Sequence, residues 1–210
     1  NISNISFDAI DDIRTGAGDD TVNAGRGSDF VDTGSGNDVV NQVAVSGTPQ
    51  IDTLEGGSGT DTLNLDYSVE SVFNYTFLNA SNVGSALTVA SSVAQIQAAL
   101  GSAVKTIFDG TFTDITASGF EVVNIIGGTG SELVIYQNGT NYDGRAGGDA
   151  FYADWSARTT PVVWNNTGAA FTYEGTNLSN FERLLLLTGS GNDNISNISF
   201  DAIDDIRTGA

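Results

Sequence analysis

The chain has 210 residues, with 26 acidic side chains against 7 basic ones and a formal net charge of −19 at pH 7. This excess of negative charge excludes a protein that binds the phosphate backbone of nucleic acids, because such a protein needs a basic face. The sequence has no Cys, no His and no Met, which excludes disulfides, zinc sites built on Cys or His, and nucleophiles activated by His. No apolar run reaches the length of a transmembrane helix, so no transmembrane segment is expected.

The first 17 residues, NISNISFDAIDDIRTGA, occur again as residues 194–210, at a spacing of 193 residues. A long identity at a fixed spacing is typical of tandem repeat architectures. We therefore expect the chain to be one period of a tandem array, with residues 194–210 belonging to the next copy. Further copies of the same repeat, joined in tandem or end to end, are then the expected partners.

A shorter period begins at Thr15, where TGAGDDTVN, AGRGSDFVD and TGSGNDVVN follow one another. Each has the form x-G-x-G-x-D-x-U-x, in which U is apolar. The half-motif DDIR precedes them, the frame returns in IDTL and GGSGTDTLN, and partial copies follow in GRAGGDAFY and TGSGNDNIS. The aspartates and glycines of these motifs are the candidate metal-binding residues: Asp11, Gly16, Gly18, Asp20, Gly25, Gly27, Asp29, Gly34, Gly36, Asp38, Asp52, Gly57, Gly59, Asp61, Gly144, Gly147, Asp149, Gly189, Gly191 and Asp193.

The pattern suits calcium for physical reasons. Glycine tolerates the positive φ values of tight turns and lets backbone carbonyl groups approach an ion. Aspartate adds a hard carboxylate oxygen, and ligation by oxygen alone favours calcium over softer transition metals. Carboxylates stacked at the spacing of neighbouring strands, about 4.8 Å, repel one another unless a cation lies between them. Solvated turns without metal are therefore the less favoured interpretation, and folding is expected to be coupled to metal binding.

These motifs resemble the hemolysin-type calcium-binding repeats of the RTX family, most closely over residues 11–42 and 52–65. The resemblance implies an all-β fold, namely a parallel β-roll or β-solenoid with calcium-binding turns, to which insertions with one short helix are added. It also implies several Ca²⁺ ions per period and a secreted, extracellular protein of the bacterial cell surface.

In that family, an ion is shared by turns that are one coil apart. Carried over to this sequence, and with residues 43–51 looped out, the resemblance implies these neighbouring pairs: Asp11 and Asp29, Asp20 and Asp38, Asp38 and Asp61, and Asp29 and Asp52. The turn before Asp52 lacks the glycine pair of the motif.

We divide the period into five segments. Residues 1–66 form a calcium-binding β-roll block, residues 67–118 an insertion, residues 119–156 a second β-roll block, residues 157–179 a second insertion, and residues 180–210 a continuation of the roll into the next copy.

The first insertion contains SSVAQIQAALG, which predicts a short helix at about residues 91–100. A serine can cap its start, Val93, Ile96 and Leu100 give one apolar face, and Gly101 suits the position after the last turn. We expect this helix to cover the roll rather than to bind a partner.

The period also contains two related halves. DTLNLDYS, from Asp61, matches DAFYADWS, from Asp149, and GFEVVNIIGGTGSELV matches NFERLLLLTGSGNDNI. In the second alignment Glu132 stands where the later segment has Asp193, which leaves calcium binding near Glu132 open.

The sequence is compatible with three functions. The first is a calcium-dependent structural repeat, an extender, filament or surface-layer module of a large secreted RTX-type protein, without enzyme activity. The second is an adhesin module that binds a glycan or a cell surface, for which Tyr67, Trp155, Trp164 and Tyr173 could form a sugar platform, although matching positions favour a core role for Tyr67 and Trp155. The third is a calcium-roll accessory module of a secreted enzyme.

Overall fold

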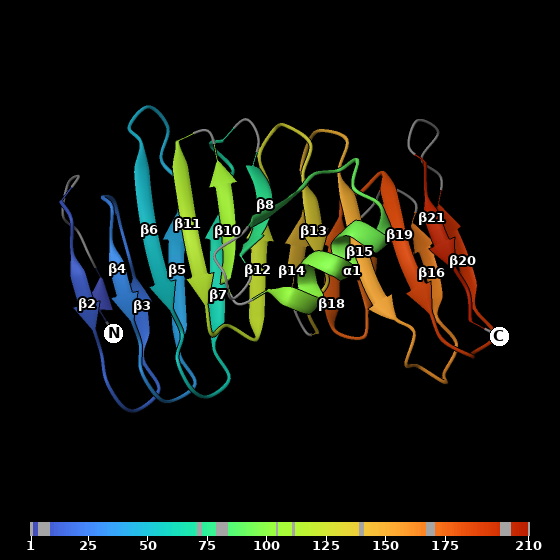
Figure 1. Ribbon diagram of the computed structural model, residues 1–210, viewed down its shortest axis with the longest axis horizontal. Coiled ribbons are helices and arrows are strands. Elements are labelled where there is room, and N and C mark those ends of the chain that lie inside the picture. The colour runs from blue at the N-terminus through green and yellow to red at the C-terminus, as the bar shows by residue number, and fades with distance from the viewer. Residues whose placement is uncertain are drawn as a thin grey trace.

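The computed structural model describes residues 2–3, 9–70, 73–78, 84–103, 105–110, 112–138, 141–166, 171–197 and 203–209. Within these ranges the chain consists of strands and one helix, arranged along one long axis (Figure 1). The predicted all-β class is confirmed. In the described part of the chain, no helix has the length and apolar character needed to cross a membrane.

Four sheets contain the strands. The first sheet has the order β1 (Ile2–Ser3), β3 (Thr21–Asn23), β5 (Val39–Val43), β7 (Thr62–Asp66), β12 (Val122–Ile126), β14 (Asn141–Asp143), β18 (Thr176–Ser179) and β17 (Phe171–Tyr173). The second has the order β2 (Asp12–Arg14), β4 (Phe30–Asp32), β6 (Gln50–Glu55), β11 (Thr113–Ser118), β10 (Lys105–Gly110), β8 (Phe73–Leu78) and β9 (Gly84–Leu87). The third comprises β13 (Leu133–Ile135), β15 (Ala150–Trp155), β19 (Arg183–Thr188) and β21 (Asp205–Arg207), and the fourth β16 (Val163–Asn166) and β20 (Asn194–Asn197).

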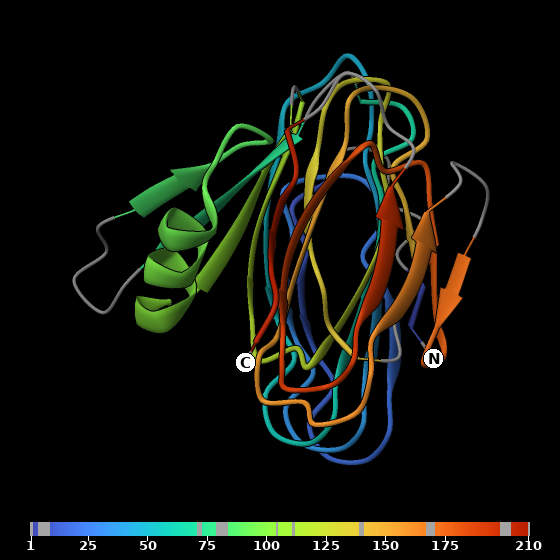
Figure 2. The ribbon, with the colours of Figure 1, turned by 90° about the vertical axis from the view of Figure 1, so that its right-hand side faces the viewer.

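From β1 to β7, consecutive strands alternate between the first and second sheets, and each of β1 to β5 pairs in parallel with the strand two places along the chain. Ile13 is the partner of Val31 on one side, and Val22 is the partner of Val40 on the other. The turns are stacked at a spacing of 18 residues between the first coils and 23 residues where the loop before β6 is added. Seen along the long axis, strands lie on two opposite sides and turns join them at the top and bottom (Figure 2). These parallel sheets fit a roll.

The short strands follow from their alternating side chains, because successive residues of a strand point to opposite faces. The central residue of TVN, FVD and VVN is apolar, and Val22, Val31 and Val40 are completely buried. Leu54 and Leu63 continue the same two columns one coil later. Each coil therefore adds one apolar side chain from each side to a continuous core.

In the second half of the chain, aromatic rings enlarge the core. The Trp155 ring lies 5.7 Å from that of Trp164 and 4.8 Å from that of Tyr173, measured between centroids. Tyr67, Trp155 and Trp164 are at most 3% exposed and Tyr173 is 8% exposed. These four residues pack in the interior, as the matching positions favoured for Tyr67 and Trp155, and they do not form an exposed sugar platform.

The first insertion forms an antiparallel extension of the second sheet. Strands β10, β8 and β9 continue from β11 and project to one side of the roll (Figure 2). Strand β11 falls in the same predicted segment but pairs in parallel with β6 over six residues. The predicted segment boundaries are not tested further and stay predictions.

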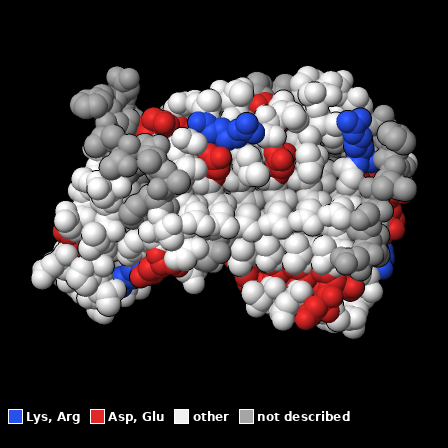
Figure 3. All heavy atoms as spheres, turned by 180° about the vertical axis from the view of Figure 1, so that it is seen from behind, with Lys and Arg blue, Asp and Glu red and all other residues white. Residues whose placement is uncertain are grey.

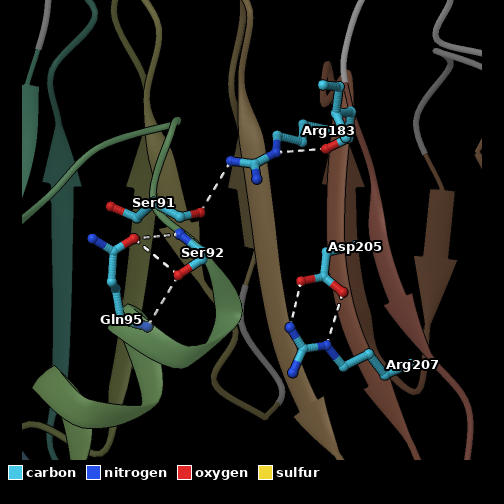
Figure 4. A network of polar contacts seen from close by, with 7 residues as sticks. Ser91, Ser92, Gln95, Arg183, Asp205 and Arg207 are labelled. Atoms are coloured by element: carbon cyan, nitrogen blue, oxygen red, sulfur yellow. Dashed lines mark hydrogen bonds and ion pairs between the residues drawn. The ribbon is translucent and has the colours of Figure 1, made fainter.

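The predicted helix is present as α1 (Val93–Ser102), with Ser92 as its N-cap in a capping box with Gln95. It ends two residues later than expected and includes Gly101, because Ala103 rather than Gly101 forms the C-cap. The segment before it docks on the third sheet through Arg183, whose guanidinium donates to the carbonyl oxygen of Val89. It also donates to the carbonyl oxygen of Ser91 (Figure 4).

The Arg183 contact yields a first prediction. Arg183→Ala should increase hydrogen exchange in residues 84–103 by about tenfold or more, because a charged donor to these partly buried carbonyl groups contributes about 1.5–3 kcal/mol. Arg207→Ala is the control, since Arg207 pairs with Asp205 at the surface and such pairs contribute about 0–1 kcal/mol. Mass-spectrometric hydrogen exchange measures both, and equal effects of the two changes would contradict the docking role.

Candidate metal centre

The acidic motif residues form two rows along the roll. Asp20, Asp38 and Asp61 each directly precede a strand of the first sheet, and we call them the first acidic row. Asp11 and Asp29 directly precede strands of the second sheet, and with Asp52, which lies within β6, they form the second acidic row. The turns of the first row lie along the lower edge of Figure 1.

Hydrogen bonds join neighbouring members of the first row. The backbone N–H of Asp20 donates to Oδ1 of Asp38 at 2.8 Å, and that of Asp38 donates to Oδ1 of Asp61 at 2.8 Å. Each carboxylate thus uses one oxygen to bind the backbone of the preceding coil.

The second row repeats this arrangement. The N–H of Asp11 donates to Oδ1 of Asp29 at 3.0 Å, and the N–H of Asp29 donates to Oδ1 of Asp52 at 2.9 Å. The four aspartate pairs that the sequence implied are therefore spatial neighbours. That they hold an ion stays a prediction.

The turn glycines stack on one another. Gly16, Gly34 and Gly57 have φ values of 99°, 89° and 94°, which favour glycine. A Cβ atom on Gly34 would lie 2.2 Å from the carbonyl oxygen of Gly16, and one on Gly57 would lie 2.1 Å from that of Gly34. The other motif glycines of this block have the same left-handed backbone: Gly18, Gly25, Gly27, Gly36 and Gly59. Glycine therefore brings a carbonyl group of each turn against the next turn.

The second carboxylate oxygen, Oδ2, of several motif aspartates lacks a hydrogen-bond partner. Oδ2 of Asp29, Asp38 and Asp61 is buried and has no hydrogen-bond partner. Burial of an unpaired carboxylate is costly, and it raises the pKa of Asp29 and of Asp61. Ion pairs among the described residues lie elsewhere: Arg14 with Asp12, Lys105 with Glu55, Arg158 with Glu174, and Arg207 with Asp205. A hard cation fits these oxygens.

Within the described residues, no group of three or more His, Cys, Asp or Glu side chains gathers to hold a metal ion. An ion in these turns would therefore have one or two carboxylate ligands, and backbone carbonyl groups would complete its shell. Calcium accepts such a mixed set of six to eight oxygens.

Two predicted ligands differ from the others. Oδ2 of Asp52 accepts a hydrogen bond of 2.7 Å from Nε2 of Gln42, and Oδ2 of Asp193 accepts one from the Thr188 hydroxyl. Their second oxygens thus already have donors from the protein itself. Neither donor was identified from the sequence, because the nonapeptide pattern contains no position for Gln42 and assigns Thr188 to the variable first position.

The later motif residues lie in the second half of the roll. Asp149, with Gly144 and Gly147 in its turn, precedes β15 and is completely buried. A Cβ atom on Gly189 would lie 1.7 Å from the carbonyl oxygen of Arg158, and one on Gly191 would lie 2.5 Å from that of Thr160. These two glycines therefore stack on a preceding turn, as those of the first block do.

The sequence reasoning missed two glutamates that continue the rows. Oε2 of Glu121 accepts from the N–H of Asp61 at 2.8 Å, and Oε2 of Glu182 accepts from the N–H of Asp149 at 2.7 Å. The signal that could have identified them is the shared Phe-Glu pair in the two matching halves.

The chain matches one family model, the RTX calcium-binding nonapeptide repeat, in four copies over residues 6–40 and 45–66. No curated protein and no solved structure matches the chain.

The stacked glycines yield a second prediction. Gly36→Ala should lower the free energy of unfolding in calcium by more than about 2 kcal/mol, since a left-handed backbone alone costs about 1–2 kcal/mol and Cβ would lie 2.2 Å from the carbonyl oxygen of Gly18. Gly101→Ala, in the helix with nothing within 4 Å, should stabilise by up to about 1 kcal/mol. Urea unfolding measures both, and a loss of the same size in both variants would contradict this account.

The buried carboxylates yield a third prediction, for the protein without calcium. Burial raises the pKa of Asp52 from 3.8 to about 7, and repulsion from Asp29 adds to this. When the pKa of a carboxyl group is higher in the folded state than in the unfolded state, folding favours the protonated form. The protein is then most stable below the unfolded pKa, and its stability falls as the pH rises towards the folded pKa. The free energy of unfolding should therefore fall from about pH 4 to pH 7.

Asp52→Asn should reduce this fall, because the amide cannot ionise. Asp12→Asn, at an exposed ion pair, is the matched control and should leave the slope unchanged. Urea titrations in chelator at pH 5 and pH 7.5 measure the difference. A slope that is identical in both variants would show that Asp52 does not ionise in this range.

Proposed function

Residues 6–66 contain RTX calcium-binding nonapeptide repeats, and from this premise we propose that the whole chain is a calcium-dependent structural repeat of a large secreted surface protein. It acts as an extender, filament or surface-layer module and not as an enzyme. The chain is acidic, flexible and only marginally stable where calcium is scarce, and it becomes a stiff roll on binding calcium outside the bacterial cell.

The observation that carries the proposal is the pairing of the repeated 17-residue segment, whose two copies lie at opposite ends of the long axis (Figure 1). In the first sheet, Ile2 of β1 pairs with Val22 of β3. Its repeat, Ile195 of β20, pairs with Trp164 of β16. One copy of this strand thus has a neighbour from the coil that follows it, and the other copy has a neighbour from a coil that precedes it.

The other side of the roll gives the same result. Ile13 of β2 pairs with Val31 of β4, and its repeat, Ile206 of β21, pairs with Leu186 of β19. If β20 and β21 are the first strands of the next copy, both sides of the roll continue across the junction without a break. Residues 4–8 and 198–202, in the middle of the repeated segment, lie outside the described residues.

The hydrogen bond from a backbone N–H to a motif carboxylate also recurs at the junction, although the donor there is Leu184 and not an acidic residue. The N–H of Leu184 donates to Oδ1 of Asp204 at 2.8 Å, and Asp204 is the repeat of Asp11. Asp11 in turn donates its N–H to Asp29. The last coil of one copy and the first coil of the next therefore have complementary carboxylate and N–H groups.

Calcium supplies positive charge to carboxylates that otherwise repel one another. Acidic side chains predominate on the lower edge of the face in Figure 3, and basic ones are few. Extracellular calcium modules bind with dissociation constants of about 10⁻⁴–10⁻³ M, and each site contributes about 2.7 kcal/mol at a hundredfold excess of ligand. Several sites together would equal the whole stability of an ordinary domain, about 5–15 kcal/mol.

The alternative of an adhesin module would use the insertions, which interrupt the roll where solenoids often bind partners. The four aromatic residues considered for sugar binding are buried, so this function would depend on other residues. The observations therefore favour the structural repeat.

A chain of three copies of residues 1–193, closed by residues 1–17, tests the proposal and yields the fourth prediction. In millimolar calcium, electron microscopy and small-angle X-ray scattering should show a uniform rod that lengthens by a constant increment per copy. Chelation should make it collapse or fray. Magnesium at the same concentration is the control, because it demands octahedral geometry and should not replace calcium.

Beads on a flexible string in calcium would instead show that each copy is a separate domain and would favour the adhesin module. A rod that persists after chelation would contradict the calcium mechanism.

A further inference from the structure

We propose a further calcium site between Glu132 and Asp149, outside the residues that match the family model. The inference rests on the proposed calcium-dependent function and extends it to the third sheet. The ligand class is a hard divalent cation bound by carboxylate and backbone carbonyl oxygens.

The backbone places the two side chains one coil apart. Strands β13 and β15 pair in parallel with Leu133 opposite Ala150, so the residues directly before them are neighbours. The N–H of Glu132 donates to Oδ1 of Asp149 at 2.7 Å, and the N–H of Ala150 donates to the carbonyl oxygen of Glu132 at 2.8 Å.

Three carboxylate oxygens meet here without a hydrogen-bond partner. Both side chains are completely buried, and Oε1 and Oε2 of Glu132 and Oδ2 of Asp149 have no donor. None of the ion pairs among the described residues includes either carboxylate. Two buried carboxylates with no cation are strongly disfavoured.

The electrostatics agree with this geometry. Burial raises the pKa of Glu132, and the neighbouring Asp149 raises it further, whereas the nearby backbone of Gly128 and Gly130 lowers it by less. A divalent cation between the two groups would stabilise both in the ionised form.

Glycines and carbonyl groups form the walls of the site. A Cβ atom on Gly144 would lie 2.7 Å from Oδ2 of Asp149 and 2.3 Å from the carbonyl oxygen of Asn180. One on Gly127 would lie 3.0 Å from Oε2 of Glu132 and 2.8 Å from the carbonyl oxygen of Gly144. The space beside the two carboxylates is thus lined by oxygen atoms, the ligand type that calcium selects.

The same arrangement occurs in the matched block. There Asp61 accepts from the N–H of Asp38 and donates its own N–H to Glu121. Here Asp149 accepts from the N–H of Glu132 and donates its own N–H to Glu182. Both Asp38 and Asp61 keep a buried oxygen without a partner, as Glu132 and Asp149 do. The Glu132 site therefore repeats the Asp38 site with a longer ligand.

Terbium luminescence offers a selective test, because Tb³⁺ replaces calcium in oxygen-rich sites and emits when nearby tryptophan is excited. Residues 1–66 contain no Trp or Tyr, and both tryptophans, Trp155 and Trp164, lie in the second half. The ring of Phe151, two residues after Asp149, lies 5.3 Å from that of Trp164 between centroids. Emission excited through tryptophan should therefore report an ion at Glu132 and not ions in the matched block.

The fifth prediction uses the full chain with three variants. Glu132→Gln keeps the shape of the side chain. It should lower the affinity for terbium, measured from the tryptophan-excited emission, by at least about tenfold, since the charge of the ligands sets the affinity. Asp154→Asn is the matched control, because this exposed carboxylate beside Trp155 lies outside the motifs and already accepts hydrogen bonds from Ser156, and it should leave the signal unchanged. Asp38→Asn should also leave the signal unchanged but remove calcium ions counted by native mass spectrometry.

The outcomes separate this inference from the proposed function. If the unaltered chain binds no calcium in native mass spectrometry, the proposed function fails. If it binds calcium but Glu132→Gln alters neither the ion count nor the terbium signal, only the Glu132 site is overturned. Should Glu132→Gln fail to fold, the Asp38→Asn variant is loaded with terbium and then titrated with calcium. Tryptophan-excited emission that calcium displaces would support the site, and the absence of any such emission would overturn it.

Discussion

The repulsion between carboxylates that recur once per coil is the constraint on which the rest of this structure depends. Parallel pairing fixes the distance between neighbouring turns at strand spacing, and the motif places an aspartate in each turn. One oxygen of each carboxylate binds the backbone of the preceding coil, so the side chain cannot turn away into solvent. The second oxygen of Asp29, Asp38 and Asp61 is consequently buried without a partner. A roll with this geometry is stable only when a cation or a hydrogen-bond donor contacts that oxygen.

The chain meets this requirement in two ways. Asp52 and Asp193 receive a donor from Gln42 and Thr188. Under the proposed function, a cation faces Oδ2 of Asp29, Asp38 and Asp61. Where an amide or a hydroxyl supplies the donor, that carboxylate oxygen is hydrogen-bonded by the protein itself. Under the proposed function, the coils without such a donor are the ones that depend on calcium. The two coils with a donor lie beside the loop before β6 and at the junction with the repeated segment.

Much of this could be read from the sequence, because the glycines and aspartates act locally. The turns and the start of α1 follow from residues within one or two motif lengths, whereas the parallel pairing and the aspartate pairs one coil apart were implied by the resemblance to the RTX repeats. What the sequence did not reveal depends on contacts between distant segments. Gln42 meets Asp52 because the loop between them folds back, Glu121 meets Asp61 from 60 residues away, and β11 joins β6 after a long insertion. The helix passes through Gly101 because its C-cap is formed by Ala103, which no local glycine rule anticipates.

The orientation of the strands has a mechanical consequence. They lie across the long axis in Figure 1, so the hydrogen bonds between coils run along it, and the two copies of the repeated segment sit at its ends. Tension between those ends pulls neighbouring strands directly apart and does not slide them past each other. Such bonds open one coil at a time, because each coil contacts only its neighbours. A tethered array would thus lengthen in small steps as single coils unfold under force, and it would shorten again as they refold when the force is released.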